Sequence, residues 1–139
     1  MLKPVLLDTG VIYALLDRSE WAHGLCVRTI EGLNRQLVTC EPVIAESSYL
    51  LRRQPQAVDA ILANIETGFF SIPFQLSHSA GEVRAILRKY QDTPADFADA
   101  CLIQMANELE TGDILTLDRH FRHYRWRRNR SFRFLIPLE

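Results

Sequence analysis

The chain has 139 residues, of which 47% are hydrophobic and 24% charged, and its formal net charge is −1. This length and composition predict one globular domain over residues 1–139 and argue against a disordered protein. No apolar run approaches the roughly 20 residues that span a bilayer, and the N-terminus lacks a signal-peptide pattern. Cys26, Cys40 and Cys101 are odd in number and widely spaced, so we expect reduced thiols in a cytoplasmic protein.

The first 35 residues alternate a short apolar run with helical patterns. A strand is expected at residues 3–8, where branched apolar residues lead to an acid. A short helix should follow over 11–16, with Gly10 allowing the turn between them. Ser19 should cap a second helix that carries Trp21 in its apolar stripe.

The next elements are bounded by proline and glycine. A strand is expected at 37–40, followed by a helix with Pro42 in its first turn. Pro55 should open another helix that stops at Gly68. Residues 69–72 have the composition of a further strand.

The last part of the chain predicts two helices and two strands. One helix should run from its cap at Ser77 to about Tyr90. A longer helix should begin at Pro94 and reach about Glu110, with Gly112 ending it. The strands are expected at 114–117 and 132–136.

Strands separated by helices, several of them apolar on both faces, predict an α/β sandwich with a mainly parallel sheet. Ligands of such sheets bind where the carboxyl ends of the strands meet. Asp8 follows the first strand and Asp118 follows the strand at 114–117. Both acids are therefore expected at the ligand-binding edge.

Two further acids interrupt apolar helix faces. Glu46 shares a face with Val43 and Leu50, and Asp99 shares one with Leu102. A lone carboxylate buried there would cost several kcal/mol or would stay protonated. A bound cation removes this penalty, and so does a purely structural hydrogen bond or arginine partner.

Taken together, these four acids suggest one crevice. Asp8, Glu46, Asp99 and Asp118 come from strand ends and inward helix faces, and no histidine lies at a zinc-site spacing from a cysteine. Such an oxygen-rich set suits Mg²⁺ or Mn²⁺. Asp96, one turn before Asp99, either joins this site or only caps its helix.

The C-terminal 21 residues concentrate positive charge and aromatic rings. They contain seven of the sixteen Lys and Arg residues, namely Arg119, Arg122, Arg125, Arg127, Arg128, Arg130 and Arg133. This pattern is typical of a surface that binds nucleic-acid phosphates. A solvated basic edge, or a surface for an acidic protein, would have the same composition.

The sequence resembles the PIN-domain ribonucleases, and within them the VapC-type toxins of toxin–antitoxin pairs. The resemblance spans nearly the whole chain and is carried by LLDTGV at 6–11, Glu46, DFADA at 96–100 and LTLDRHF at 115–121. It implies a PIN-like three-layer sandwich and an acidic quartet that binds Mg²⁺ or Mn²⁺. It further implies an RNA substrate, a homodimer and a small antitoxin protein as partners.

Carried across by position, the implied quartet is Asp8, Glu46, Asp99 and Asp118. Thr9 and Thr116 correspond to supporting hydroxyls, and the candidate RNA-binding residues are Arg119, Arg122, Arg125, Arg127 and Arg128. One position departs from the family. A second acid often stands two residues after the last one, where this chain has His120.

Two other functions are alternatives to a metal-dependent ribonuclease. Asp8-Thr9-Gly10 also occurs in aspartic proteases, but these need two such loops in an all-β fold, whereas this chain has one triplet and a helical pattern. A catalytically silent PIN-like module that binds RNA or protein is the second alternative, and the intact acidic set argues against it.

Overall fold

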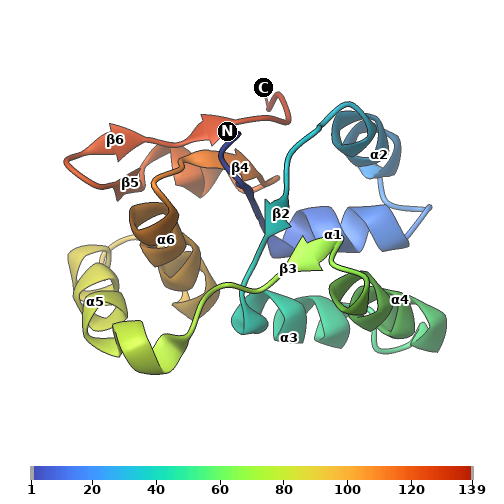
Figure 1. The fold of residues 1–139 in the computed structure, drawn as a ribbon, viewed down its shortest axis with the longest axis horizontal. Helices are drawn as coiled ribbons and strands as arrows, with labels where there is room; N and C mark the ends of the chain where they lie inside the picture. The colour runs from blue at the N-terminus through green and yellow to red at the C-terminus, as the bar shows by residue number, and fades with distance from the viewer. Residues whose placement is uncertain (1, 139) are drawn as a thin grey trace.

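β1 (Val5–Leu7) lies in the middle of a five-stranded parallel sheet in the computed structural model, which describes residues 2–138 (Figure 1). The strand order is β3-β2-β1-β4-β7. The other strands are β2 (Leu37–Val38), β3 (Phe70–Ser71), β4 (Asp113–Leu115) and β7 (Arg133–Phe134). The predicted mainly parallel sheet is confirmed.

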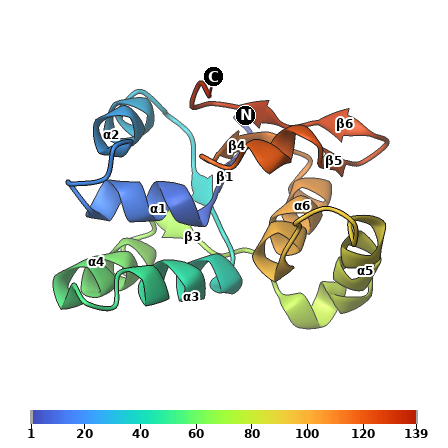
Figure 2. The same cartoon turned by 180° about the vertical axis from the view of Figure 1, so that it is seen from behind.

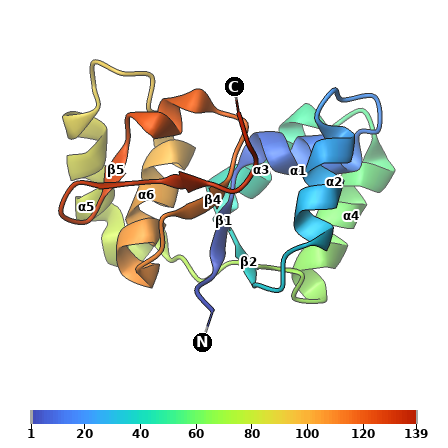
Figure 3. The ribbon, with the colours of Figure 1, turned by 90° about the horizontal axis from the view of Figure 1, so that it is seen from above.

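Helices cover both faces of this sheet. They are α1 (Thr9–Leu16), α2 (His23–Glu31), α3 (Glu41–Leu50), α4 (Pro55–Glu66), α5 (Leu76–Lys89) and α6 (Phe97–Leu109). Viewed from above, α5 and α6 lie on one side of the strands and α1 to α4 on the other (Figure 3). α3 also contacts α6, so it connects the two outer layers. The three-layer sandwich is confirmed.

β1 and α6 lie at the centre of the core. All three residues of β1 are fully buried, as expected of a central parallel strand with helices on both faces. α6 is buried continuously from Ala98 to Ala106. Its outer side is covered by α5 and by a hairpin of β5 (Arg125–Trp126) and β6 (Arg130–Ser131), as seen from behind in Figure 2. A helix this apolar needs cover all round.

The start of the second helix was predicted wrongly. α2 begins at His23, and Ser19 instead donates its hydroxyl and its backbone N–H to Asp17 Oδ1, at 2.6 Å and 3.0 Å. This local turn competes with helix formation and leaves Trp21 74% exposed outside the core. Gly10 is also not the turn residue, because it lies inside α1, which Asp8 caps.

Three later boundaries differ from prediction. α5 begins at Leu76, one residue before its expected cap Ser77. α6 begins at Phe97 instead of Pro94, because Asp96 caps it. The expected strand at 132–136 is reduced to β7, and the preceding hairpin and the short 3₁₀ helix η1 (Arg119–Arg122) were not predicted.

Gly112 has a packing role instead of a helix-ending one. Glu110, with φ 56°, is the left-handed cap of α6. A Cβ on Gly112 would lie 2.0 Å from Nε1 of Trp126. Glycine therefore lets the indole pack against the chain between α6 and β4.

Within residues 2–138, no helix has the length and apolar character needed to cross a bilayer.

Candidate metal centre

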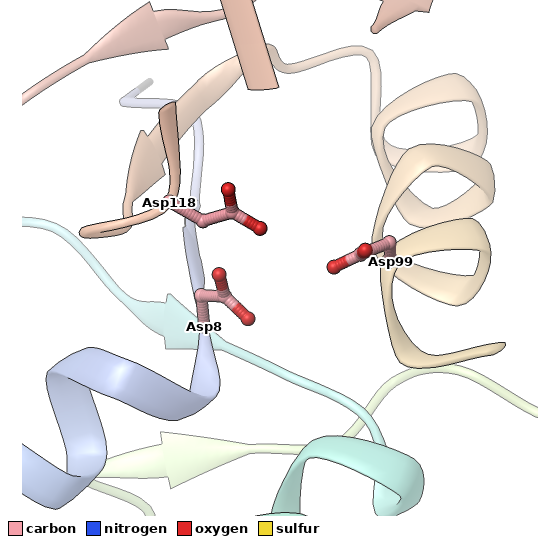
Figure 4. Close-up of side chains that lie close together, drawn as sticks. All are labelled: Asp8, Asp99 and Asp118. Atoms are coloured by element: carbon pink, nitrogen blue, oxygen red, sulfur yellow. The ribbon is translucent and has the colours of Figure 1, made fainter. Parts of the chain in front are cut away.

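Three aspartates meet at the carboxyl edge of the sheet. Asp8 follows β1 and Asp118 follows β4, and these strands pair in parallel with Leu7 opposite Leu115. Asp99 points toward them from the first turn of α6 (Figure 4). One carboxylate oxygen from each lies within 4.8 Å of the others. The predicted convergence of these three residues is thus observed.

Asp8 is buried and held by two hydrogen bonds. The backbone N–H of Thr9 donates to Oδ1 at 2.8 Å, and the Thr116 hydroxyl donates to Oδ2 at 2.6 Å. Burial raises the pKa of Asp8 to about 6, since the loss of hydration outweighs these two bonds, and the charge of Asp118 adds to the rise. The structure therefore holds the Asp8 carboxyl group in one orientation but disfavours its ionised form.

Asp99 is the second buried acid and belongs to a capping box. Its backbone N–H donates to Asp96 Oδ1 at 2.9 Å, and Asp96 N–H donates back to Asp99 Oδ2 at 3.2 Å. Burial raises the pKa of Asp99 to about 8, and the hydrogen bond from Asp96 offsets only part of this effect. The carboxylates of Asp96, Asp8 and Asp118 raise it further.

Asp118 caps η1 and is the most accessible of the three. Its backbone N–H donates to Thr116 Oγ1 at 3.0 Å, so one threonine hydroxyl orders both strand-end acids. His120 contacts Asp118 Oδ1 twice, through its backbone N–H at 2.9 Å and through Nδ1 at 2.7 Å. The residue that departs from the family pattern therefore contacts the fourth predicted acid.

Glu46 and Asp96 lie beside this trio. Glu46 is exposed on α3, and the Thr9 hydroxyl donates to its Oε2 at 3.5 Å. The expected inward face is wrong, because α3 buries Val43 and Ser47 while Leu50 is 50% exposed. Even so, partial burial, followed by the charges of Asp96 and Asp8, raises the pKa of Glu46. Both acids belong to the rim of the cluster.

The donor set suits a divalent cation. Across the described chain, no Lys or Arg forms an ion pair with Asp8, Asp99 or Asp118. Buried carboxylates without a counter-charge are costly, and oxygen-only ligands are those that hard divalent cations take. The arrangement could therefore hold a metal ion, which would supply the missing positive charge.

The model of the PIN domain family matches residues 5–127. The chain belongs to the PIN-domain family. Ribonuclease VapC26 of Mycobacterium tuberculosis is 30% identical over 122 residues, which cover 86% of this chain and 89% of that protein. The crystal structure of Mycobacterium tuberculosis VapC20, described as a sarcin-ricin loop cleaving toxin, matches with a TM-score of 0.75 at 17% identity. That match covers 82% of this chain and 89% of VapC20 and shows the shared fold. The resemblance to VapC-type PIN domains is confirmed.

Several arginines of this PIN domain stabilise its C-terminal segment. Arg122 donates to the carbonyl of Leu138 at 2.7 Å. Arg125 donates to the carbonyls of Arg122 and Tyr124 at 2.7 Å and 2.9 Å. These guanidinium groups replace backbone partners that short strands and turns do not provide.

The other basic candidates differ in how they are paired. Arg127 is tied to Glu110 at 2.5 Å and to the Asn107 carbonyl at 2.9 Å. Arg119 and Arg128 are exposed, and the described residues offer neither a hydrogen bond nor an ion pair to their side chains. These two are the arginines most available to a ligand.

Tyr124 is a site residue that the sequence did not suggest. It is fully buried, and its hydroxyl lies 3.5 Å from Asp99 Oδ2. Its ring meets Tyr90 edge-on, with centroids 5.1 Å apart. The only sequence signal is its position among the aromatic residues of the arginine-rich segment, whose composition predicts a surface. Tyr124 instead closes the inner wall of the PIN-domain acid cluster.

Proposed function

We propose that this PIN domain hydrolyses RNA phosphodiester bonds with the help of Mg²⁺ or Mn²⁺, as the toxin of a toxin–antitoxin pair. The observation that carries the proposal is the trio of Asp8, Asp99 and Asp118, whose oxygens lie within 4.8 Å of one another and which form no ion pair with a Lys or Arg among the described residues. The substrate class is supported by the relatives, one named a ribonuclease and the other described as a toxin that cleaves the sarcin-ricin loop.

Asp8, Asp99 and Asp118 are proposed to hold the ion directly. Glu46 and Asp96, which lie outside the trio, are proposed to contribute through water. When bound, the ion lowers the pKa of a water molecule for in-line attack and stabilises negative charge on the phosphate.

The remaining site residues keep the ligands in place. Thr116 orients two of them with one hydroxyl, since it donates to Asp8 Oδ2 and accepts from the Asp118 backbone. Thr9 links Asp8 to Glu46 through its backbone and its hydroxyl. Such preorganisation matters because small displacements of catalytic groups cost large factors in rate.

The proposal is tested by cleavage of fluorescent RNA with and without metal. Wild-type protein should cleave with Mg²⁺ or Mn²⁺, stop with chelator and recover when metal is restored. Asp99→Asn should lose activity by at least roughly a hundredfold, whereas Asp59→Asn should be neutral, because Asp59 is exposed on α4. Asp99→Asn cleaving RNA as fast as Asp59→Asn would show that the acid cluster is not the active site.

Calorimetry separates this function from a silent RNA-binding or protein-binding module. We expect heat of Mn²⁺ binding from the wild type and much weaker binding by Asp99→Asn. The absence of both binding and cleavage would favour the silent module.

We also propose a homodimer and an antitoxin as protein partners. A hollow of about 410 Å³ on α3 is lined by Ala45, Glu46, Tyr49 and Leu50. Tyr49 is 64% exposed there, and exposed apolar surface beside a site is typical of a protein interface. Light scattering of the purified chain tests the dimer, and co-purification with the product of a neighbouring short reading frame tests the antitoxin. The free, buried cysteines support a reducing compartment such as the cytoplasm.

A further inference from the structure

A second hollow lies away from the acid cluster, between α5, α6 and the β5–β6 hairpin. Its volume is about 440 Å³, within the range of small-ligand sites. Figure 2 shows the hairpin above α6 and α5 beside it. Lys89, Arg125, Arg127 and Arg128 line it, and none of its lining residues is acidic. We call it the basic pocket.

Most of the positive charge in the basic pocket is not neutralised. Arg127 is paired with Glu110. Arg125 donates only to uncharged backbone carbonyls, and Lys89 stands 5.3 Å above the Tyr90 ring. Within residues 2–138, no side chain or carbonyl forms a hydrogen bond or ion pair with Arg128, which is exposed. Three cations without carboxylate partners around one concavity indicate an anionic ligand.

The hairpin loop that carries two of these arginines is fixed to α6. Asn107 accepts the backbone N–H of Arg127 at 2.7 Å through its side chain, and its carbonyl accepts Nε of the same arginine at 2.9 Å. Arg127 and Asn129 adopt φ of 26° and 69°, in the left-handed region. Anchoring at Asn107 therefore holds the loop in a disfavoured conformation that keeps the arginines at the pocket.

The basic pocket is connected to the acid cluster through α6 and two tyrosines. Tyr90 lines the pocket and contacts Tyr124, which reaches Asp99. The pocket residues Ile103 and Asn107 follow Asp99 on α6, so they lie about 6 to 12 Å further along its axis. A stacked strand advances about 3.4 Å per nucleotide, so this is a distance of roughly two to four nucleotides.

We propose that the basic pocket binds the phosphodiester backbone of single-stranded RNA a few nucleotides from the bond that is cleaved. The assignment rests on the proposed ribonuclease function and adds a backbone subsite to it. The pocket residues of α6 lie about one to two helical turns from Asp99, within reach of a strand bound at the acid cluster, and this proximity favours RNA over an acidic protein surface. Backbone contacts of this kind raise affinity without selecting sequence.

The test compares two double variants of equal charge change. Lys89→Ala/Arg128→Ala removes the two pocket cations that have no hydrogen-bond or ion-pair partner among the described side chains. Arg18→Ala/Arg84→Ala removes two exposed arginines that do not line the pocket.

Binding is measured in an Asp99→Asn background with an RNA of roughly 12 nucleotides at several salt concentrations. The pocket variant should bind several-fold more weakly, and its log–log salt slope should fall by about 1.4, or 0.7 per lost phosphate contact. Equal slopes for the two double variants would overturn the proposal.

A cleavage measurement separates this proposal from the ribonuclease function itself. With metal, the pocket variant should show a raised KM for the long RNA and an unchanged kcat/KM for a dinucleotide, which cannot reach the pocket. Failure of the wild type to cleave either substrate would overturn the proposed function and this subsite with it. Normal cleavage by the wild type with no KM change in the pocket variant would overturn only the subsite.

Competition identifies the ligand. Inorganic phosphate and AMP should displace the RNA only at much higher concentration than unlabelled RNA. AMP bound as tightly as the RNA, and lost in the pocket variant, would mean a mononucleotide site and contradict the proposal. Stronger displacement by polyglutamate than by RNA would equally contradict it and indicate an acidic protein. Both double variants should have the same melting temperature as the parent protein, which shows that their folds are intact.

Discussion

Asp8→Asn is expected to make the metal-free protein more stable at alkaline pH while removing activity. Asp8 is buried at the carboxyl end of β1, where it caps α1, and its pKa is raised from 3.8 to about 6. The unfolded chain ionises this acid more readily than the folded chain does, so ionisation opposes folding. Asparagine has nearly the same shape, cannot ionise and removes that opposition.

The size of the effect follows from the pKa difference. Because the folded pKa is the higher one, the stabilisation by Asp8 is complete below about pH 4 and is lost as pH rises through about 6. About two pKa units correspond to about 3 kcal/mol at most. Asparagine can still accept the hydrogen bond from the Thr9 backbone N–H. It replaces the hydrogen bond between the Asp8 carboxylate and Thr116 with one between uncharged groups, which costs about 1 kcal/mol. The net gain expected at about pH 8 is about 2 kcal/mol, or roughly 8 °C in Tm.

Thermal melting with chelator at about pH 4 and pH 8 measures this difference. Asp8→Asn should melt above wild type at the higher pH and near it at the lower one. Adding Mn²⁺ should reverse the order at the higher pH, because only the wild type gains stability from tight binding.

Asp113→Asn is the matched control of opposite sign. The hydrogen bond from Arg133 and a second one from Arg35 lower the pKa of Asp113. Its stabilisation is present above the unfolded pKa and disappears as pH falls. Asp113→Asn should therefore lower Tm at alkaline pH and have less effect in acid. If both variants lowered Tm by the same amount at both pH values, the assigned ionisation penalty at Asp8 would be refuted.

The remaining predictions concern metal binding, orientation and packing. Mg²⁺ or Mn²⁺ should raise Tm, and metal binding should release protons near neutral pH, since the pKa of Asp99 is raised to about 8. Calorimetry in buffers of different ionisation enthalpy would detect the proton release, and heats that do not depend on the buffer would contradict it. Thr116→Val should lower kcat by roughly tenfold or more with the fold intact, because it removes the hydroxyl that orients Asp8. Thr116→Ser should keep most of the activity. An equal loss of activity in both variants would argue against an orienting hydroxyl. Gly112→Ala should lower the free energy of unfolding, measured in urea, by about 1 to 3 kcal/mol, because its Cβ would lie 2.0 Å from Nε1 of Trp126. An unchanged unfolding midpoint would mean that the indole moves freely.

Local signals located most elements but not their ends. Apolar runs and prolines placed the five sheet strands and six helices within a few residues, because side-chain periodicity records which face is buried. The errors occurred where a side chain bonded to nearby backbone, as Asp17 does when it accepts from the N–H of Ser19, or where a cap such as Asp96 overrode a proline. The β5–β6 hairpin was missed since its residues are arginine-rich and the strands are two residues each.

The sequence by itself determined the α/β sandwich and the acids that end its central strands. Burial on both faces and the parallel connection of β1 to β4 require Asp8 and Asp118 to share an edge. Only the tertiary structure decided which groups face them. The packing of α6 buries Asp99 against Tyr124, whereas the packing of α3 leaves Glu46 exposed at the rim. It also turned Arg122, Arg125 and Arg127 toward backbone carbonyls and left the side chains of Arg119 and Arg128 without a hydrogen bond or ion pair among the described residues. Such contacts join residues far apart in the chain, and the periodicity of the sequence does not predict them.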